Sequence, residues 1–236
     1  SVLAAIMLMY LLMSGAAAQA EVALPGPLVT AEWLQENIDD VVVLDVRKDV
    51  DSFLQDGHIE GAVLVDARKI RVDREVDGFK LTGMLPDRTQ YEAFMSAHGV
   101  GTDSIVVISH RGEKAGNVAG AARLYWQMKY YSFENVALLD GGTRAWTDAL
   151  GDMTTDATVI PSAKLVAGVE RKELLATKSD VLEALNNESI QMVDTRNLRF
   201  HIGLEKRDYV ASAGHIPGSA LFPHRFLHPE KGAAVF

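Results

Sequence analysis

Cysteine is absent from the 236 residues of this chain. Its absence excludes disulfide bonds, metal sites built on thiolates and a cysteine nucleophile within these residues. The net charge of −9 argues against nucleic acid or an anionic membrane surface as the main partner. An acidic chain can still bind an anion, but it then needs a local cluster of Arg, Lys and backbone N–H groups.

Charge is missing altogether from the first twenty residues. An apolar run extends from Val2 to Met13, and Ala18-Gln19-Ala20 forms the small-residue pattern of a signal-peptide cleavage site. We therefore expect 1–20 to be a secretory signal that is removed on export to the periplasm, after which no membrane contact remains. An uncleaved membrane anchor is the alternative, although the run is shorter than the roughly 20 apolar residues of a full span. An initiator Met and a positively charged segment are also lacking, so we expect a few residues to be missing at the start.

Valine-rich apolar runs alternate with helix-like segments from residue 31 onward. The runs are typical of strands that are buried on both faces; they lie at 41–46, 61–66, 104–109 and 135–141. Helical patterns lie between and around them, at 31–38, 88–98, 118–131 and 144–150. This alternation predicts an α/β fold with a mainly parallel sheet and helices on both faces.

Composition changes after residue 150. Residues 151–170 have the irregular, Pro- and Thr-containing composition of a linker. A second unit is then expected over 171–236, with a helix at 180–185 that Ser179 caps and a strand at 190–196.

Two heptapeptides of this chain are nearly identical: DGHIEGA at 56–62 and AGHIPGS at 213–219. A strand ending in Asp-x-Arg precedes each of them. Asp45 corresponds to Asp194, 149 residues later, and Gly57 corresponds to Gly214, 157 residues later. The same elements in the same order indicate a tandem duplication of one α/β domain, in which the second copy has the longer loop.

The motifs together resemble the rhodanese (thiosulfate sulfurtransferase) family. They are VVVLDVR, GHIEGA, VVIS and NVALLDGGTRAW in the first unit, and VDTR and GHIPGS in the second. The resemblance implies tandem rhodanese-like domains: a non-catalytic first domain over 29–150 and part of a second over 171–236. It also implies a catalytic cysteine in the second domain, which takes sulfur from thiosulfate or 3-mercaptopyruvate and passes it to cyanide or a thiol. No metal or organic cofactor is implied.

The position that matches the family's cysteine in the first unit is Ser109, at the end of VVIS. Serine cannot carry a persulfide, and the surroundings lack the Gly-x-Ser-x-Gly elbow of a serine hydrolase. The loop that follows, HRGEKAGN, is either a solvated structural loop or an anion site formed by His110, Arg111 and Lys114. The matching position of the second unit falls after Phe236, so we expect the chain to be a fragment that ends before the catalytic cysteine and is itself inactive.

Several polar residues have both a functional and a structural interpretation. His58 and His215 could be catalytic or metal-binding, but their spacing favours a hydrogen bond that fixes a loop. Asp45 and Arg47, like the second pair at 194 and 196, are expected to form an ion pair within their unit. The aromatic residues of 123–131 have helical spacing and are expected in the core rather than in a binding site.

The loop RNLRFHIGLEKRDY of the second unit is rich in basic residues. In two-domain family members, an Arg directly before an aromatic residue helps to bind the sulfur donor, and the resemblance gives this role to Arg199, which precedes Phe200. A solvated charge is the alternative.

Two functions therefore remain open. The first is a sulfurtransferase with a small anionic sulfur donor. The second is a cysteine-free rhodanese-like module that binds or regulates without catalysis. A cysteine that opens a loop before a helix, in the sequence after Phe236, would favour the enzyme.

Overall fold

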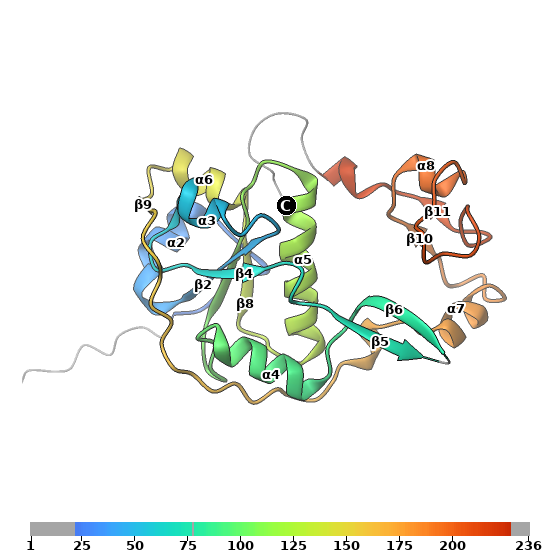
Figure 1. Cartoon of the computed structure of the whole chain (residues 1–236), viewed down its shortest axis with the longest axis horizontal. Coiled ribbons are helices and arrows are strands. Elements are labelled where there is room, and N and C mark those ends of the chain that lie inside the picture. The colour runs from blue at the N-terminus through green and yellow to red at the C-terminus, as the bar shows by residue number, and fades with distance from the viewer. Residues whose placement is uncertain (1–21, 77, 228–236) are drawn as a thin grey trace, which may run out of the picture.

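The computed structural model describes residues 22–76 and 78–227 (Figure 1). The signal peptide expected at 1–20 lies outside the described residues. Within the described part, no helix is both long enough and apolar enough for a membrane span.

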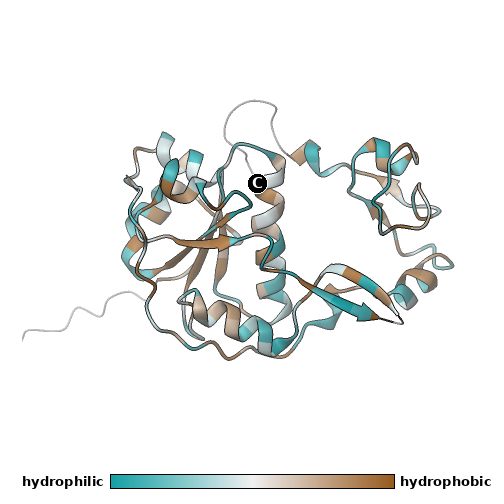
Figure 2. Cartoon of the chain, in the orientation of Figure 1, coloured by the Kyte–Doolittle hydropathy of each residue, from teal (hydrophilic) through white to brown (hydrophobic). Residues whose placement is uncertain are grey.

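A five-stranded parallel sheet forms the centre of the first unit. The strand order is β1-β8-β7-β2-β4. The bounds are β1 Leu28–Val29, β2 Val42–Arg47, β4 Val63–Asp66, β7 Val106–Ser109 and β8 Val136–Leu139. Figure 2 shows these strands in the colour of apolar residues, as the valine-rich runs predicted. The α/β class with a mainly parallel sheet is confirmed.

Helices cover the two faces of this sheet because alternate strand residues point to opposite sides. On one face, Leu44, Val46 and Ile108 pack with α4 (Arg88–Ala97) and α5 (Ala115–Tyr130). On the other face, Val43 and Val107 pack with α2 (Ala31–Asn37) and α6 (Gly142–Asp148). The helix starts follow the sequence, since Thr30 caps α2 and Asp87 forms a capping box with Gln90 at α4.

A β-hairpin that the sequence analysis did not predict connects β4 to α4. It consists of β5 (Val72–Val76) and β6 (Phe79–Met84), and Figure 1 shows it extending away from the sheet. The pairs Val72–Met84 and Val76–Phe79 alternate with the charged pair Glu75–Lys80. Charged residues interrupt the apolar pattern here, so the segment lacked the valine-rich run by which the core strands were recognised.

The segment predicted as a linker packs on the first unit over much of its length. The Leu165 side chain of this segment is buried, and the Leu165 N–H donates to Ser96 Oγ at 2.9 Å. The Ala167 N–H donates to Glu92 Oε1 at 2.8 Å. Apart from the two-residue strand β9 (Met153–Thr154), the segment has no helix or strand, as its composition predicted, but composition could not reveal these contacts with α4.

The second unit contains short elements only within the described residues. They are η2 Lys172–Leu174, α7 Lys178–Ala184, β10 Val193–Asp194, α8 Leu198–His201, β11 Ala220–Leu221 and η3 His224–Leu227. The remaining short elements of the first unit are η1 Ile38–Asp40, α3 Ser52–Gln55 and β3 His58–Ile59, and β3 pairs with β9 of the segment 151–170.

Two boundaries in the second unit differ from the sequence expectation. Thr177, not Ser179, caps the helix, because Asp180 lies at the third helical position and completes a capping box with Thr177. The strand expected at 190–196 is limited to Val193–Asp194, because β11 pairs with these two residues alone. Ile190, Val193 and Phe222 are each about half exposed, at 47%, 52% and 46%.

Candidate functional site

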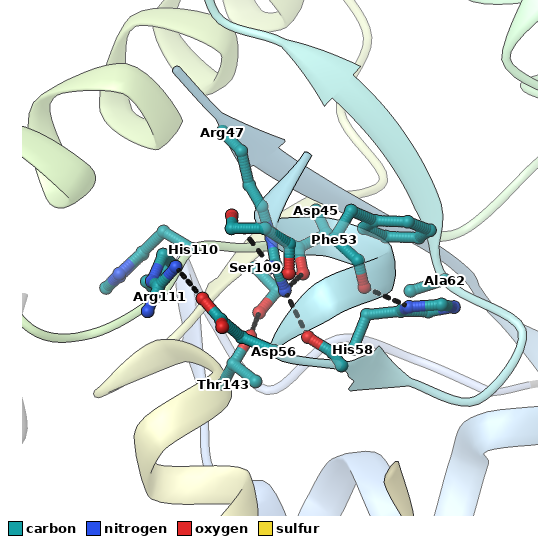
Figure 3. A network of polar contacts seen from close by, with 12 residues as sticks. Asp45, Arg47, Phe53, Asp56, His58, Ala62, Ser109, His110, Arg111 and Thr143 are labelled. Atoms are coloured by element: carbon teal, nitrogen blue, oxygen red, sulfur yellow. Dashed lines mark hydrogen bonds and ion pairs between the residues drawn. The ribbon is translucent and has the colours of Figure 1, made fainter. Parts of the chain in front are cut away.

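The carboxyl ends of β2 and β7 lie side by side at the centre of the sheet, and the candidate site of the first unit is built there (Figure 3). The chain leaves β2 toward β4 on one side and leaves β7 toward β8 on the other. In parallel α/β sheets, ligands bind at such a reversal, outside the carboxyl ends of the strands. The loops after β2 and β7 are therefore the place to look for a site.

Asp45 and Arg47 form a buried ion pair at the end of β2. Arg47 Nη2 lies 2.7 Å from Asp45 Oδ2, and the two side chains are 2% and 0% exposed. The remaining donors of the guanidinium bind two loop carbonyls, Ser52 O at 2.7 Å and Gly57 O at 2.8 Å. The predicted pair is confirmed, and it also ties the whole loop 48–57 to the strand.

His58 has the structural contacts that the sequence favoured. Its Nδ1 lies 2.9 Å from Phe53 O, and its ring stacks on the Phe53 ring with 3.5 Å between centroids. Within 22–76 and 78–227, no group of three or more acidic or histidine side chains is arranged to hold a metal ion.

The second unit repeats most of these contacts. Within the described residues, Arg196 has no counterpart of the Arg47–Ser52 hydrogen bond, and Asp194 Oδ2 also lies 3.0 Å from His201 Nδ1. Arg196 Nη2 lies 2.7 Å from Asp194 Oδ2 and 2.8 Å from Gly214 O. His215 Nδ1 lies 2.8 Å from His201 O, and the two imidazole rings stack at 3.8 Å. The hydrogen bond from Arg196 holds the pKa of Asp194 well below its usual range.

The strand register repeats as well. Asp45 is paired with Leu64 in the first unit, and Asp194 is paired with Leu221 in the second. These partners are separated by the same 149 and 157 residues that separate the two copies of the sequence motifs. The two units differ in exposure, because Arg196 is 43% exposed where Arg47 is 2% exposed.

Ser109 is enclosed rather than presented to a ligand. Its side chain is 0% exposed, and its Oγ lies 3.1 Å from Thr143 Oγ1 at the start of α6. The Thr143 N–H donates to His110 O at 2.7 Å, which holds the loop after β7 against α6. The sequence analysis did not identify Thr143, which directly follows two glycines.

Two glycines make this closure possible. A Cβ at Gly112 would lie 2.1 Å from Gly141 O, and a Cβ at Gly142 would lie 2.1 Å from His110 O. Both glycines have positive φ, so a side chain at either position would be strained as well as crowded.

The hollow beside this loop has a volume of about 210 Å³, and Arg47, Arg111 and Arg144 are among its lining residues. Its cations are already neutralised. Arg111 forms ion pairs with Asp56 at 2.6 Å and Glu113 at 2.8 Å, and hydrogen bonds to Glu113 and Asp56 raise its pKa. Arg144 pairs with Asp148. The structure therefore favours the structural interpretation of the loop HRGEKAGN over an anion site.

Arg199 lies on α8 in the second unit, where its side chain is 61% exposed and pairs with Glu205. The neighbouring Phe200 ring lies between two other guanidiniums, at 5.9 Å from Arg196 Cζ and 5.5 Å from Arg207 Cζ. Two guanidiniums thus lie over the Phe200 ring, and Arg199, the residue before it, is reachable from solvent.

The enclosure of Ser109 gives a direct labelling prediction. In the variant Ser109→Cys the new thiol is the only one in the chain, so iodoacetamide reports on a single site. We expect native protein to react at least ~100-fold more slowly than the same protein in urea, because the reaction requires local opening.

The matched control is Ser189→Cys, at an exposed position after α7. This thiol should react at nearly the same rate in native and unfolded protein. Rapid native labelling at position 109, similar to that at 189, would show that the loop after β7 is open.

Comparison with known proteins agrees with this architecture. Residues 30–149 match the model of the rhodanese-like domain. The sulfur carrier protein TtuD of Thermus thermophilus is 29% identical, over 84% of this chain and 70% of its own length. The 3-mercaptopyruvate sulfurtransferase of Escherichia coli K12 is 27% identical, over 83% of this chain and 70% of its own.

A thiosulfate sulfurtransferase of Cricetulus griseus is also 27% identical, over 87% of this chain and 71% of its own. Among solved structures, an anaerobic ergothioneine biosynthesis enzyme of Chlorobium limicola has the same fold, with a TM-score of 0.71 at 22% identity. The match covers 89% of this chain, which spans about 55% of that enzyme. The family match over half of the sequence, together with the geometry of the sheet and its loops, shows that this chain belongs to the rhodanese-like sulfurtransferase family.

Proposed function

We propose that this chain is part of a two-domain sulfurtransferase that moves sulfane sulfur from thiosulfate or 3-mercaptopyruvate to cyanide or a thiol. The main support is the repeated network in which an Asp-x-Arg strand end binds the carbonyl of the Gly-His-Ile segment, at 2.8 Å in both units. In this proposal the two units, 29–150 and 171–236, are tandem copies of one rhodanese-like domain, joined by 151–170. The sulfurtransferase relatives match this chain across both units.

The chemistry needs a thiolate. A cysteine thiolate attacks the outer sulfur of thiosulfate, the S–S bond breaks, and sulfite leaves with the bonding electron pair. Cyanide then attacks the outer sulfur of the persulfide and the S–S bond breaks. Thiocyanate leaves, and the thiolate is restored. We place the cysteine in a continuation of the second unit beyond Phe236, after the strand that corresponds to β7. Ser109 holds that position in the first unit and is enclosed, which supports a non-catalytic first unit.

Arg199 is proposed to hold the anionic group of the sulfur donor. Its side chain is 61% exposed, against 43% for Arg196, and its ion pair with Glu205 is at the surface. Surface ion pairs contribute little free energy, so a dianionic donor can replace Glu205. No cofactor is required in this proposal.

A cysteine-free module that binds or regulates is the second candidate, and the absence of cysteine from these 236 residues is the observation in its favour. The complete reading frame separates the two. The enzyme requires a cysteine at the start of the loop that corresponds to 109–114.

We also propose that the protein is exported and loses residues 1–20, on the basis of the apolar run and the Ala18-Gln19-Ala20 pattern. The intact mass of protein recovered from the periplasm should then correspond to a chain that begins at Glu21. A mass that retains 1–20 would support a membrane anchor instead.

The role of Arg199 is tested in the complete protein, by following thiocyanate formed from thiosulfate and cyanide. Arg199→Ala should lower kcat/KM roughly ten- to a hundredfold, mainly through a higher KM, because a hydrogen bond to a charged group contributes about 1.5–3 kcal/mol. The chain of 236 residues, assayed in parallel, should form no thiocyanate above the uncatalysed rate.

Arg144→Ala is the matched control, since Arg144 is similarly exposed and ion-paired but lies on α6 of the first unit. It should leave the kinetics unchanged. Equal kinetics for the wild type and Arg199→Ala would exclude Arg199 as a donor ligand, and turnover by the 236 residues alone would exclude the missing cysteine as the sulfur carrier.

A further inference from the structure

Arg71 and Arg123 of the first unit lie close together and both lack a carboxylate partner, as do Arg74 and Arg88 elsewhere in the unit. Their neighbours in the fold are neutralised: Arg47, Arg68 and Arg111 each form an ion pair. Across the described residues, no Asp or Glu oxygen is placed within 4.0 Å of the Arg71 or Arg123 guanidinium. In a chain with a net charge of −9, two adjacent unpaired cations are unexpected.

Arg123 is held in place but is poorly satisfied. It lies half-buried on α5, with its Cζ 4.8 Å from the centroid of the Trp126 ring. Its Nε donates to Gln127 Oε1 at 3.3 Å and its Nη2 donates to Gly83 O at 3.4 Å. Both hydrogen bonds are longer than the usual 2.7–3.2 Å, and a guanidinium carries about five N–H donors. Most of the hydrogen-bonding capacity of Arg123 is therefore not used by protein groups.

Arg71 reaches the same place from the other side of the hairpin. It directly precedes β5, and its Cδ lies 3.7 Å from where a Cβ at Gly83 would stand. Gly83 is also the residue whose carbonyl accepts from Arg123. Figure 1 shows the chain passing α5 on its way from β4 into this hairpin. Both side chains thus reach Gly83 of β6.

The charges of the two side chains oppose each other. Burial lowers the pKa of Arg123, and the positive charge of Arg71 lowers it further. The ring of Trp126 stays fixed beneath Arg123, because its Nε1–H donates to Leu174 O at 3.0 Å. Repulsion between positioned like charges is relieved when an anion lies between them.

We propose that Arg71 and Arg123 form a binding site for a small oxyanion at the junction of α5 and the β5–β6 hairpin. A guanidinium presents two parallel N–H groups that match two oxygens of a sulfate, thiosulfate or phosphate group. The site is separate from the hollow beside Ser109, whose cations are already paired, and from Arg199 in the second unit. It does not depend on the proposed sulfur transfer, since it requires no thiol.

Calorimetric titration of the full chain with sodium sulfate, thiosulfate or phosphate tests this site, at constant ionic strength set with sodium chloride. We expect Arg71→Gln and Arg123→Gln each to weaken binding about tenfold or more, because each removes a charge-assisted contact. Arg68→Gln is the matched control: Arg68 is exposed, lies three residues from Arg71 and is already paired with Asp66. It should leave the affinity unchanged.

Thermal unfolding in chloride alone gives a second readout that a merely structural arginine would not produce. Arg71→Gln removes the repulsion on Arg123 and should raise Tm without added oxyanion, while losing the further increase that sulfate gives to the wild type. Tighter binding of thiosulfate than of phosphate would assign the site to a sulfur oxyanion, and the reverse would assign it to a phosphate group; either supports the site. Equal affinities for the wild type and Arg71→Gln, or a lower Tm of Arg71→Gln in chloride, would overturn it.

Discussion

The buried ion pair between Asp45 and Arg47 is the interaction on which the first unit's functional edge depends. Both side chains lie almost entirely out of water, where an ion is tolerated only if its hydrogen-bonding capacity is used. Arg47 meets this condition by binding the Asp45 carboxylate and the carbonyls of Ser52 and Gly57. One side chain thereby connects the end of β2 with the middle and the far end of the loop that follows it.

The corresponding pair in the second unit shows how solvent exposure changes the contribution of similar contacts to stability. Arg196 binds Asp194 and the carbonyl of Gly214 with nearly the same geometry, but it is 43% exposed. Solvent screens an exposed pair, so its contribution to stability is small compared with that of a buried pair. The apolar residues around it, such as Val193 and Phe222, are also half exposed. The buried pair therefore stabilises the first unit, whereas the exposed pair contributes little to the stability of the second.

The sequence predicted those features that follow from strong local patterns. The four valine-rich runs became core strands, and the repeated Asp-x-Arg and Gly-His-Ile motifs became repeated contacts. The β5–β6 hairpin was not predicted, because three consecutive charged residues, Asp73 to Glu75, interrupt its first strand and resemble a loop. Contacts between distant segments could not be predicted from local patterns either. The hydrogen bonds of Leu165 with Ser96 and of Thr143 with Ser109 depend on tertiary packing. Phe53 beside His58 was missed because the second unit has a histidine, His201, in its place.

The central claim is that the buried Asp45–Arg47 pair, and not its exposed copy, organises the first unit. Its most direct test is urea unfolding of Arg47→Lys and Arg196→Lys, followed by tryptophan fluorescence. All three tryptophans, Trp33, Trp126 and Trp146, lie in the first unit, and Trp33 and Trp146 report on its core; Trp126 also donates to Leu174 O of the second unit. Lys cannot reproduce the fork of contacts that Arg47 makes, and we predict a loss of at least about 2 kcal/mol for Arg47→Lys, against less than about 1 kcal/mol for Arg196→Lys. Equal midpoints for the two variants would contradict the account.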